Sequence, residues 1–190
     1  SIAGIAAHCR EHGKRFGVIW IDAHADMNTP DSTPSGNIHG MPLAVSLGYG
    51  APQLTDIMRF SPKVDPSNVA LIGIRSVDPG ERTLIKACKV MAHTMPDIDK
   101  KGVYSIMRSV LRHMKEHVDH LHVSFDLDSV DPTLVKGVGT PIPGGFSYRE
   151  IHLAMEMIAD SGLLRSLEVA EVNPILDDKN SSAVLACDVV

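Results

Sequence analysis

Short, continuous apolar runs recur along the chain, separated by segments in which apolar residues return every three or four positions. Four of these runs are rich in β-branched or aromatic residues, namely residues 16–21, 69–74, 122–127 and 167–172. Runs of this kind are typical of strands that are covered on both faces. The pattern therefore predicts four buried strands, as in the core of a parallel sheet.

Helical spacing fills the segments between these strands. Apolar residues follow a 3.6-residue period over residues 2–9, 103–114 and 151–158, which predicts three amphipathic helices. Gly13 is the predicted C-cap of the first helix, and Ser147 with Glu150 has the spacing of a capping box at the start of the third. Asn180 and Ser181 favour the start of one more helix over residues 183–186. Strands alternating with helices predict one α/β domain over residues 1–190 with a mainly parallel sheet.

Composition narrows the possible classes of protein. The 190 residues include 18 Lys and Arg against 23 Asp and Glu, so no basic surface for nucleic acid is expected. The three cysteines lie far apart and form no CxxC pair, which argues against a disulfide framework and for a reducing, cytoplasmic setting. No apolar run has the length of a membrane span, and residues 1–7 lack the basic flank of a signal peptide. We therefore expect a soluble protein without nucleic-acid or membrane partners.

Acidic residues gather where two of the predicted strands end. Asp22, His24 and Asp26 alternate directly after the first strand, and Asp126 and Asp128 alternate at the end of the third. A two-residue period points alternate side chains the same way, and parallel α/β sheets bind ligands at the carboxyl ends of their strands. Converging carboxylates would repel one another, and a hard or borderline metal such as manganese would relieve the repulsion. The alternative is that each Asp only caps the turn after it, which requires neither alternation nor a histidine.

Several segments resemble the arginase and agmatinase family, the ureohydrolases. Trp-Ile-Asp-Ala-His-Ala-Asp at residues 20–26 and Ser-Phe-Asp-Leu-Asp at residues 124–128 are similar to its two metal-ligand signatures. The long aperiodic loop carries Asn-Thr-Pro at 28–30 and Ser-Gly-Asn-Ile-His-Gly at 35–40, which resemble arginases of the bacterial type in particular. Further matches are Gly-Ile-Arg at 73–75, Val-Asp-Pro-Gly-Glu at 77–81, Gly-Thr-Pro at 139–141, Gly-Gly at 144–145 and Glu-Val-Asn-Pro at 171–174. The resemblance covers almost the whole chain and implies the three-layer α/β/α fold of the family, without its N-terminal segment.

The resemblance also implies a ligand set for two Mn²⁺ ions. Asp22 and Asp126 are expected to bridge the ions, while His24 and Asp128 complete one site and Asp26 serves the other. In the family a further histidine of the second site closes a Gly-Gly-Asp-His motif directly upstream of the first residue here. We therefore expect one complete manganese site and one incomplete site.

The family chemistry assigns further roles. Two divalent ions lower the pKa of a shared water enough to attack a guanidinium carbon near neutral pH. Asp128 is expected to take up the proton, His39 to pass a proton to the leaving amine, and Glu171 to pair with the substrate guanidinium near Thr140. The simpler alternatives are that His39 is a surface residue and that Glu171 forms an ordinary ion pair at a strand end.

The amino-acid end of the substrate requires its own contacts. The resemblance assigns the α-carboxylate and α-amino groups to polar residues of the long loop and of residues 77–81, namely Asn28, Thr33 through water, Ser35, Asn37, Asp78 and Glu81. Asp78, Pro79 and Glu81 are also a good helix start, with Asp at the N-cap, Pro at N1 and Glu at N3. Capping alone explains the Asp78 segment almost as well as substrate binding.

The function that the resemblance implies is hydrolysis of L-arginine to L-ornithine and urea by a homotrimer or hexamer. A related ureohydrolase such as an agmatinase is the first alternative, although its substrate lacks the carboxylate that the loop would bind. The second alternative is a metal-binding or oligomerisation module without catalysis, because the expected N-terminal segment is absent. The chain departs from the family pattern at residues 134–136, where the family usually has a proline.

Overall fold

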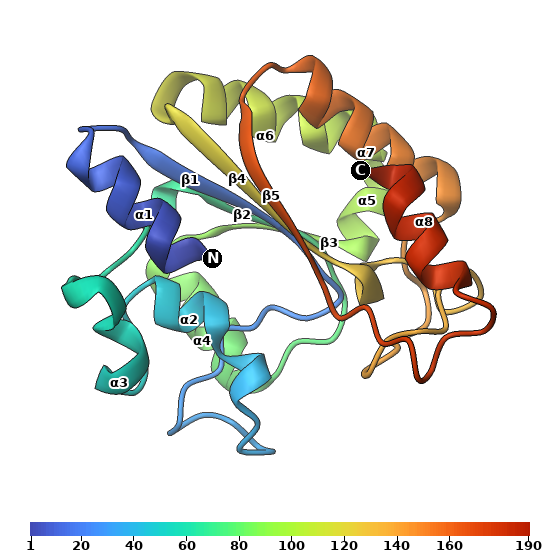
Figure 1. Cartoon of the computed structure of the whole chain (residues 1–190), viewed down its shortest axis with the longest axis horizontal. Coiled ribbons are helices and arrows are strands. Elements are labelled where there is room, and N and C mark those ends of the chain that lie inside the picture. Colours follow the sequence, from blue (N-terminus) through green and yellow to red (C-terminus); the bar gives the residue numbers. More distant parts are fainter.

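A parallel five-stranded sheet forms the centre of the computed structural model, which describes residues 1–190 (Figure 1). The strands are β1 (Phe16–Ile21), β2 (Val69–Ile74), β3 (Met91–Thr94), β4 (His120–Asp126) and β5 (Leu164–Ala170), in the order β3-β2-β1-β4-β5. All four strand pairings are parallel, so every strand ends at the same edge of the sheet. No helix has the length and apolar composition to cross a bilayer.

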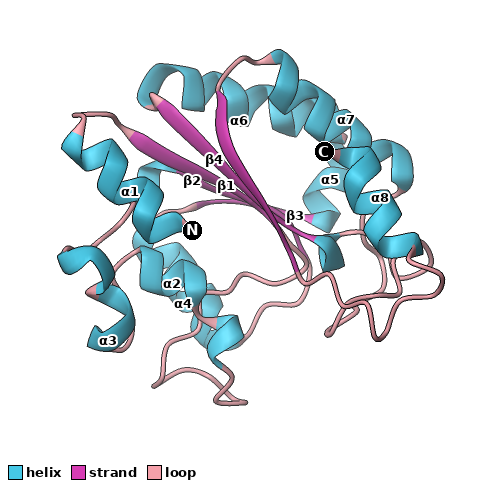
Figure 2. Cartoon of the chain, in the orientation of Figure 1, coloured by secondary structure: helices cyan, strands magenta, loops and turns pink.

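Helices cover both faces of this sheet, which confirms the predicted three-layer α/β/α architecture (Figure 2). On one side lie α1 (Ile2–Glu11), α2 (Pro42–Ser46), α3 (Pro52–Thr55) and α4 (Pro79–Cys88), and on the other α5 (Met95–Lys101), α6 (Val103–His117), α7 (Tyr148–Asp160) and α8 (Ser181–Val189). Successive side chains of a strand point to opposite faces. Ile19 and Ile21 therefore pack in a cluster with α5 to α8, whereas Val18 and Trp20 pack in a second cluster with α1, α2 and α4.

The helix signals in the sequence are confirmed. The opening helix has His12 as its C-cap, one residue earlier than the predicted Gly13, which follows in the left-handed region. Ser147 and Glu150 form the predicted capping box of α7. Asn180 is the N-cap of α8, which runs beyond the predicted 183–186.

The predicted strands are correct at the centre of the sheet and less accurate at its edges. β1 and β2 have the predicted bounds and are buried throughout, whereas β5 spans Leu164–Ala170 instead of the predicted 167–172 and is only half-buried. The prediction that this strand is buried is wrong: the residues of β5 are only partly buried, and the strand lies at the edge of the sheet. The other edge strand, β3, has no apolar run and was not predicted.

Candidate active site

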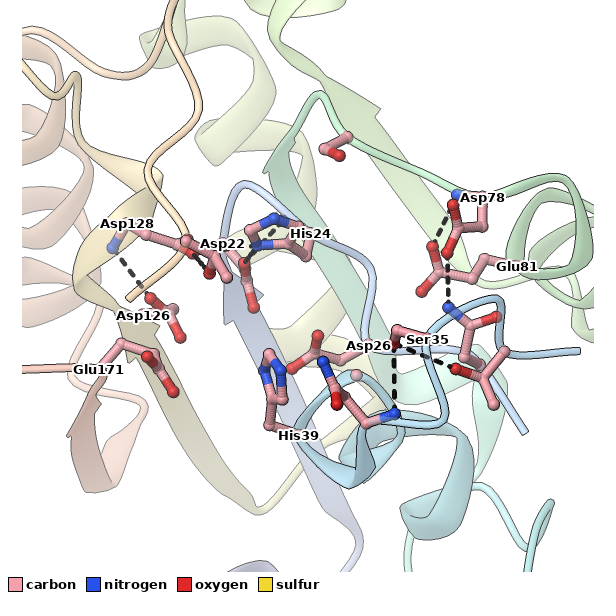
Figure 3. A pocket seen from close by; sticks show the side chains of 16 residues that line it. Asp22, His24, Asp26, Ser35, His39, Asp78, Glu81, Asp126, Asp128 and Glu171 are labelled. Atoms are coloured by element: carbon pink, nitrogen blue, oxygen red, sulfur yellow. Dashed lines mark hydrogen bonds and ion pairs between the residues drawn. The ribbon is translucent and has the colours of Figure 1, made fainter. Parts of the chain in front are cut away.

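A cavity of about 220 Å³ opens at the carboxyl ends of the strands (Figure 3). Sixteen residues line this cavity, and none of them is hydrophobic. All of the site residues expected from the sequence are among the sixteen, and the other two are Gly40 and Ser76. Residues that lie far apart in the sequence therefore meet in one polar pocket, as the topology of a parallel sheet predicts.

Turns, rather than strand alternation, bring the acidic residues together. β1 ends at Ile21, so Asp22 and the residues after it lie beyond the strand, and Asp26 has a positive φ of 52°. β4 ends at Asp126, and Asp128 lies within the 3-10 turn Leu127–Ser129. The predicted convergence is correct, but the predicted cause, a two-residue period, does not apply beyond the strand ends.

Three side chains of this group are in direct contact. His24 Nδ1 lies 3.0 Å from Asp128 Oδ2 and 3.4 Å from Asp22 Oδ1. One ligand atom from each of the three residues falls within 4.8 Å of the others. An imidazole nitrogen and carboxylate oxygens at this spacing can bind one divalent cation.

The same aspartates also cap the turns that carry them. Asp22 Oδ1 accepts from the His24 N–H at 2.6 Å, and Asp126 Oδ1 accepts from the Asp128 N–H at 2.9 Å. The Trp20 indole N–H donates to Asp22 Oδ2 at 2.8 Å. The two alternatives drawn from the sequence are therefore compatible, because these carboxylates cap turns and also line the cavity, and the capping Oδ1 of Asp22 itself lies 3.4 Å from His24 Nδ1.

Burial and mutual repulsion change the acidities of these groups. Burial and the charges of Asp22 and Asp128 raise the pKa of Asp126 to about 10. Burial, partly opposed by the hydrogen bond with His24, raises the pKa of Asp22 to about 6, and burial with the charge of Asp22 raises the pKa of Asp26. Burial alone would lower the pKa of His24, but its contacts with Asp128 and Asp22 outweigh burial and raise that pKa to about 10.

These shifts describe a pocket with an excess of negative charge. The raised pKa values of the carboxylates follow from a cavity that no lysine or arginine lines, in which His24 is shared between Asp22 and Asp128. A divalent cation would supply the missing positive charge and displace those protons. The donor set, mainly carboxylate oxygens with one imidazole, fits Mn²⁺ better than Zn²⁺.

A buried carboxylate attaches the long loop, residues 27–40, to the start of α4. Glu81 Oε1 accepts from the Met27 N–H at 2.9 Å, and Glu81 Oε2 accepts from the Asp78 N–H at 2.8 Å. Beside this contact Asn28 Nδ2 donates to Asp78 Oδ2 at 2.9 Å, and Ser32 Oγ donates to Asn28 Oδ1 at 3.1 Å. Glu81 thus caps α4 as the sequence predicts, with both of its oxygens engaged by backbone N–H groups.

The rest of the loop forms an exposed rim over the pocket. The Gly36 N–H donates to Thr33 Oγ1 at 3.1 Å, and the Asn37 N–H donates to Ser35 Oγ at 3.2 Å. His39 lies in the 3-10 turn Ile38–Gly40 and is exposed. Figure 3 shows Ser35 and His39 on the same side of the cavity as Asp26, facing the acidic group.

The opposite wall comes from the segments after β4 and β5. Thr140 Oγ1 donates to Asp128 Oδ2 at 3.1 Å, which brings the Thr140 turn onto the acidic group. Glu171 is exposed and has a positive φ of 61°, directly after β5. The prediction that Glu171 ends a buried strand is wrong, since β5 stops at Ala170 and is an edge strand.

Helix α8 supports this wall where the family proline is missing. Ser182 Oγ, which is fully buried, accepts from the Lys136 N–H at 3.1 Å and the Gly137 N–H at 2.8 Å. The Asn173 N–H donates to the Gly137 carbonyl at 2.8 Å. Hydrogen bonds from a neighbouring helix and loop therefore fix the segment that leads to Thr140.

Sequence reasoning gave no role to three residues that contact the site. Trp20 and Arg75 stand inside matched motifs, but nothing in their spacing shows that their side chains bond to Asp22 or to the Asp128 backbone. Ser76 lines the cavity next to Arg75. A polar residue directly after a predicted strand was the available signal for Arg75 and Ser76.

The fold and the pocket together define an α/β protein with a carboxylate-rich site of the kind that binds divalent metal ions. The chain belongs to the arginase family, whose model matches residues 1–190.

Curated relatives show the same family at high identity. The chain is 50% identical over 186 residues to an arginase of Bacillus caldovelox and 49% identical over 187 residues to an arginase of Bacillus subtilis strain 168. The matches cover 98% of this chain but 61% and 63% of those proteins. The chain therefore spans about six-tenths of the length of these relatives.

Solved structures agree with this assignment. The arginase of Bacillus caldovelox matches with a TM-score of 0.95 and 48% identity, over 99% of this chain and 63% of that chain. The Entamoeba histolytica arginase, solved with L-ornithine, matches with a TM-score of 0.89 and 34% identity, over 99% and 64% of the two chains. A formimidoylglutamase of Bacillus subtilis, at 24% identity and a TM-score of 0.82, shows likeness of fold alone.

Proposed function

We propose that this chain forms the catalytic centre of an arginase, which hydrolyses L-arginine to L-ornithine and urea with Mn²⁺. The observation that carries the proposal is the meeting of an acidic, histidine-containing group with an arginase-type loop in one cavity. The names of the relatives support the same reaction. An oligomer, a trimer or hexamer by resemblance, is part of the proposal, and light scattering after size exclusion tests it.

The residues present fit two ions of unequal affinity. Asp22, His24, Asp126 and Asp128 would hold one ion, and Asp26 would hold a second together with the shared carboxylates of Asp22 and Asp126. When bound, two divalent ions lower the pKa of a shared water towards neutrality. The first set contains an imidazole and the second contains carboxylates only, so we expect one tight and one weaker Mn²⁺ to bind.

Asp128 is the residue proposed to hold the proton of the attacking water. Its Oδ1 accepts from the Ala23 N–H at 3.2 Å, and its Oδ2 faces both His24 and Thr140. Contacts with His24 and the Ala23 N–H outweigh the effect of burial and lower the pKa of Asp128, so this carboxylate is ionised and able to accept a proton. Thr140 would keep Oδ2 in place.

Two exposed residues are proposed to act on the guanidinium group. Glu171 would pair with it through both carboxylate oxygens, because an exposed side chain at the wall of the cavity is free to meet a substrate. His39 would donate a proton to the leaving amine, since an imidazole can gain and release a proton in catalysis and the His39 turn borders the cavity.

The loop rim and the start of α4 are proposed to bind the amino-acid end of the substrate. Neutral polar groups at the rim, from Thr33, Ser35 and Asn37, would bind the α-carboxylate, and Asp78 would bind the α-amino group. Asn28 and Glu81 would hold this surface in place, because their side chains are engaged within the protein. These contacts favour arginine over agmatine, which has no carboxylate.

Urea release from L-arginine and from agmatine, with and without added Mn²⁺, tests the proposal. We expect Mn²⁺-dependent activity with a preference for arginine, and a loss of about 100-fold or more in kcat for Asp128→Asn. A preference for agmatine would reassign the substrate. Equal activity in EDTA and in Mn²⁺ would contradict the metal-dependent chemistry.

A further inference from the structure

Arg75, the first residue after β2, has its guanidinium group surrounded by backbone carbonyls of the active-site wall. Nε and Nη2 donate to the Ile142 carbonyl at 3.2 and 2.7 Å. Nη2 also donates to the Asp128 carbonyl at 2.8 Å, and Nη1 donates to the Ser129 carbonyl at 3.0 Å. A weaker contact of 3.5 Å joins Nη1 to the Gly73 carbonyl.

These bonds connect three separate segments of the pocket. Through its own N–H, Arg75 also donates to the Ala23 carbonyl at 2.8 Å, directly beside Asp22. The Ile142 carbonyl belongs to the turn that carries Thr140, and the Asp128 carbonyl belongs to the central residue of the acidic group. Arg75 therefore links these segments, joining the Asp128 and Thr140 turns through its side chain and the residues after β1 through its backbone N–H.

The surroundings of Arg75 leave little room for movement. A Cβ atom on Gly145 would lie 2.6 Å from Arg75 Nη2 and 2.6 Å from both the Asp131 nitrogen and the Ser129 carbonyl oxygen. Asp131 Oδ2 accepts from the Gly145 N–H at 3.1 Å, which holds this segment from the other side. The region around Arg75 is close-packed, so the guanidinium group and the backbone of Ser129, Asp131 and Gly145 cannot shift independently.

Arg75 makes no hydrogen bond to a carboxylate, although it is half-buried. Its charge faces carbonyl dipoles and lies near the negative charges of Asp128, Asp131 and Asp22. A guanidinium group has five N–H donors in a rigid plane, whereas a lysine has three donors at a single point. Only an arginine can reach the Ile142, Asp128 and Ser129 carbonyls together.

We infer that Arg75 is a positioning residue that sets the Asp128 backbone and the Thr140 turn, and thereby the affinity of the pocket for a divalent metal. The inference rests on the proposed metal role of Asp128. Residues that hold metal ligands in place commonly change metal affinity by about 10- to 100-fold when substituted.

Mn²⁺ binding to Arg75→Lys tests the inference, with the dissociation constant measured from the EPR signal of free Mn²⁺. Arg15→Lys is the control, because the Arg15 guanidinium group also joins separate segments, donating to the Asp119 carboxylate and the Glu116 carbonyl, but at the opposite end of the sheet. We expect binding about 10- to 100-fold weaker for Arg75→Lys and unchanged binding for Arg15→Lys. Unchanged binding by a folded Arg75→Lys would overturn the inference, and so would equal weakening by both variants.

Gly145→Ala tests the same contacts of Arg75 by a second route if Arg75→Lys does not fold. The added methyl group pushes against Arg75 Nη2 and the backbone around it while the arginine stays in place. We expect weaker Mn²⁺ binding here too. The value of kcat for urea release should fall while KM changes little, because Arg75 does not line the substrate cavity. Wild-type Mn²⁺ affinity in a folded Gly145→Ala protein would contradict the inference, whereas failure of the wild-type protein to bind Mn²⁺ would contradict the proposed function.

Discussion

Burial separates the polar residues of the loop 27–40 into two kinds. The side chain of Asn28 is buried, with its amide bonded to Asp78 and its carbonyl oxygen bonded to Ser32. Ser35 is exposed at the rim of the cavity. The structure thus divides the proposed carboxylate-binding set into a residue that shapes the loop and a residue that can meet the substrate directly.

Substitution of these two residues should affect arginine and agmatine differently. Ser35→Ala should weaken arginine binding by about 1 to 3 kcal/mol, through a lost hydrogen bond to the carboxylate, and leave agmatine unaffected. Asn28→Ala should weaken the binding of both substrates and lower the melting temperature, because it removes the hydrogen bond that attaches the loop to Asp78. Steady-state kinetics with both substrates measures this, and an equal loss for Ser35→Ala would show that Ser35 shapes the loop instead.

At the scale of elements, the active site depends on how loops are attached to the ends of strands and helices. Glu81 joins the loop 27–40 to α4, and Ser182 of α8 holds residues 136–137. Burial raises the pKa of Glu81, while two backbone N–H groups favour its ionised form. Burial outweighs these two hydrogen bonds, so the pKa of Glu81 stays above its usual value.

Glu81→Gln should disrupt the joint between the loop and α4. The amide group of glutamine must face one of the two N–H donors, at Met27 or Asp78, and leave it buried without an acceptor. We expect a loss of about 1 to 3 kcal/mol in the free energy of unfolding, measured by denaturant titration.

Glu150→Gln is the control for this substitution. Glu150 has the same capping position in α7, where Ser147 supplies both donors and the helix start is more exposed, and a glutamine is tolerated there. Glu150→Gln should therefore lower the free energy of unfolding by less than Glu81→Gln does. Equal losses for the two variants would show that Glu81 acts only as a helix cap.

At the scale of the whole molecule, protons and metal compete for the same negative pocket. Asp126 and His24 both have pKa values raised to about 10. The folded state therefore holds these two protons more tightly than the unfolded state does. Their contribution to stability is complete below the unfolded pKa values and is lost as the pH rises through the folded ones.

The metal-free protein should accordingly become less stable between pH 7 and 9. This window lies above the region in which His93 and His120, whose pKa values burial lowers, act in the opposite direction. Saturating Mn²⁺ should remove this loss of stability, because the bound ion replaces the protons on Asp126 and His24. Calorimetric melting temperatures in EDTA and in Mn²⁺ measure both effects, with Asp126→Asn expected to flatten the slope in EDTA. A melting temperature in EDTA that rises over this window would contradict the assigned shifts.

The accuracy of the sequence predictions followed the position of each segment in the sheet. β1 and β2 were predicted with their observed bounds because central strands covered on both faces consist of unbroken apolar runs. β3 and β5 lie at the edges, where partial exposure permits polar residues and weakens the apolar pattern.

The sequence by itself determined which residue types could bind a metal and that Asp22 and Asp126 lie at the ends of two strands, since composition and strand ends are local properties. Only the tertiary structure decided that Glu81 joins two segments, that Glu171 lies exposed after an edge strand, and that Arg75 bonds to four carbonyls. These features depend on contacts between residues more than 50 positions apart, such as Arg75 with Asp128 and with Ile142. Periodicity and spacing describe neighbours along the chain, whereas packing of the sheet and its loops decides which distant groups meet.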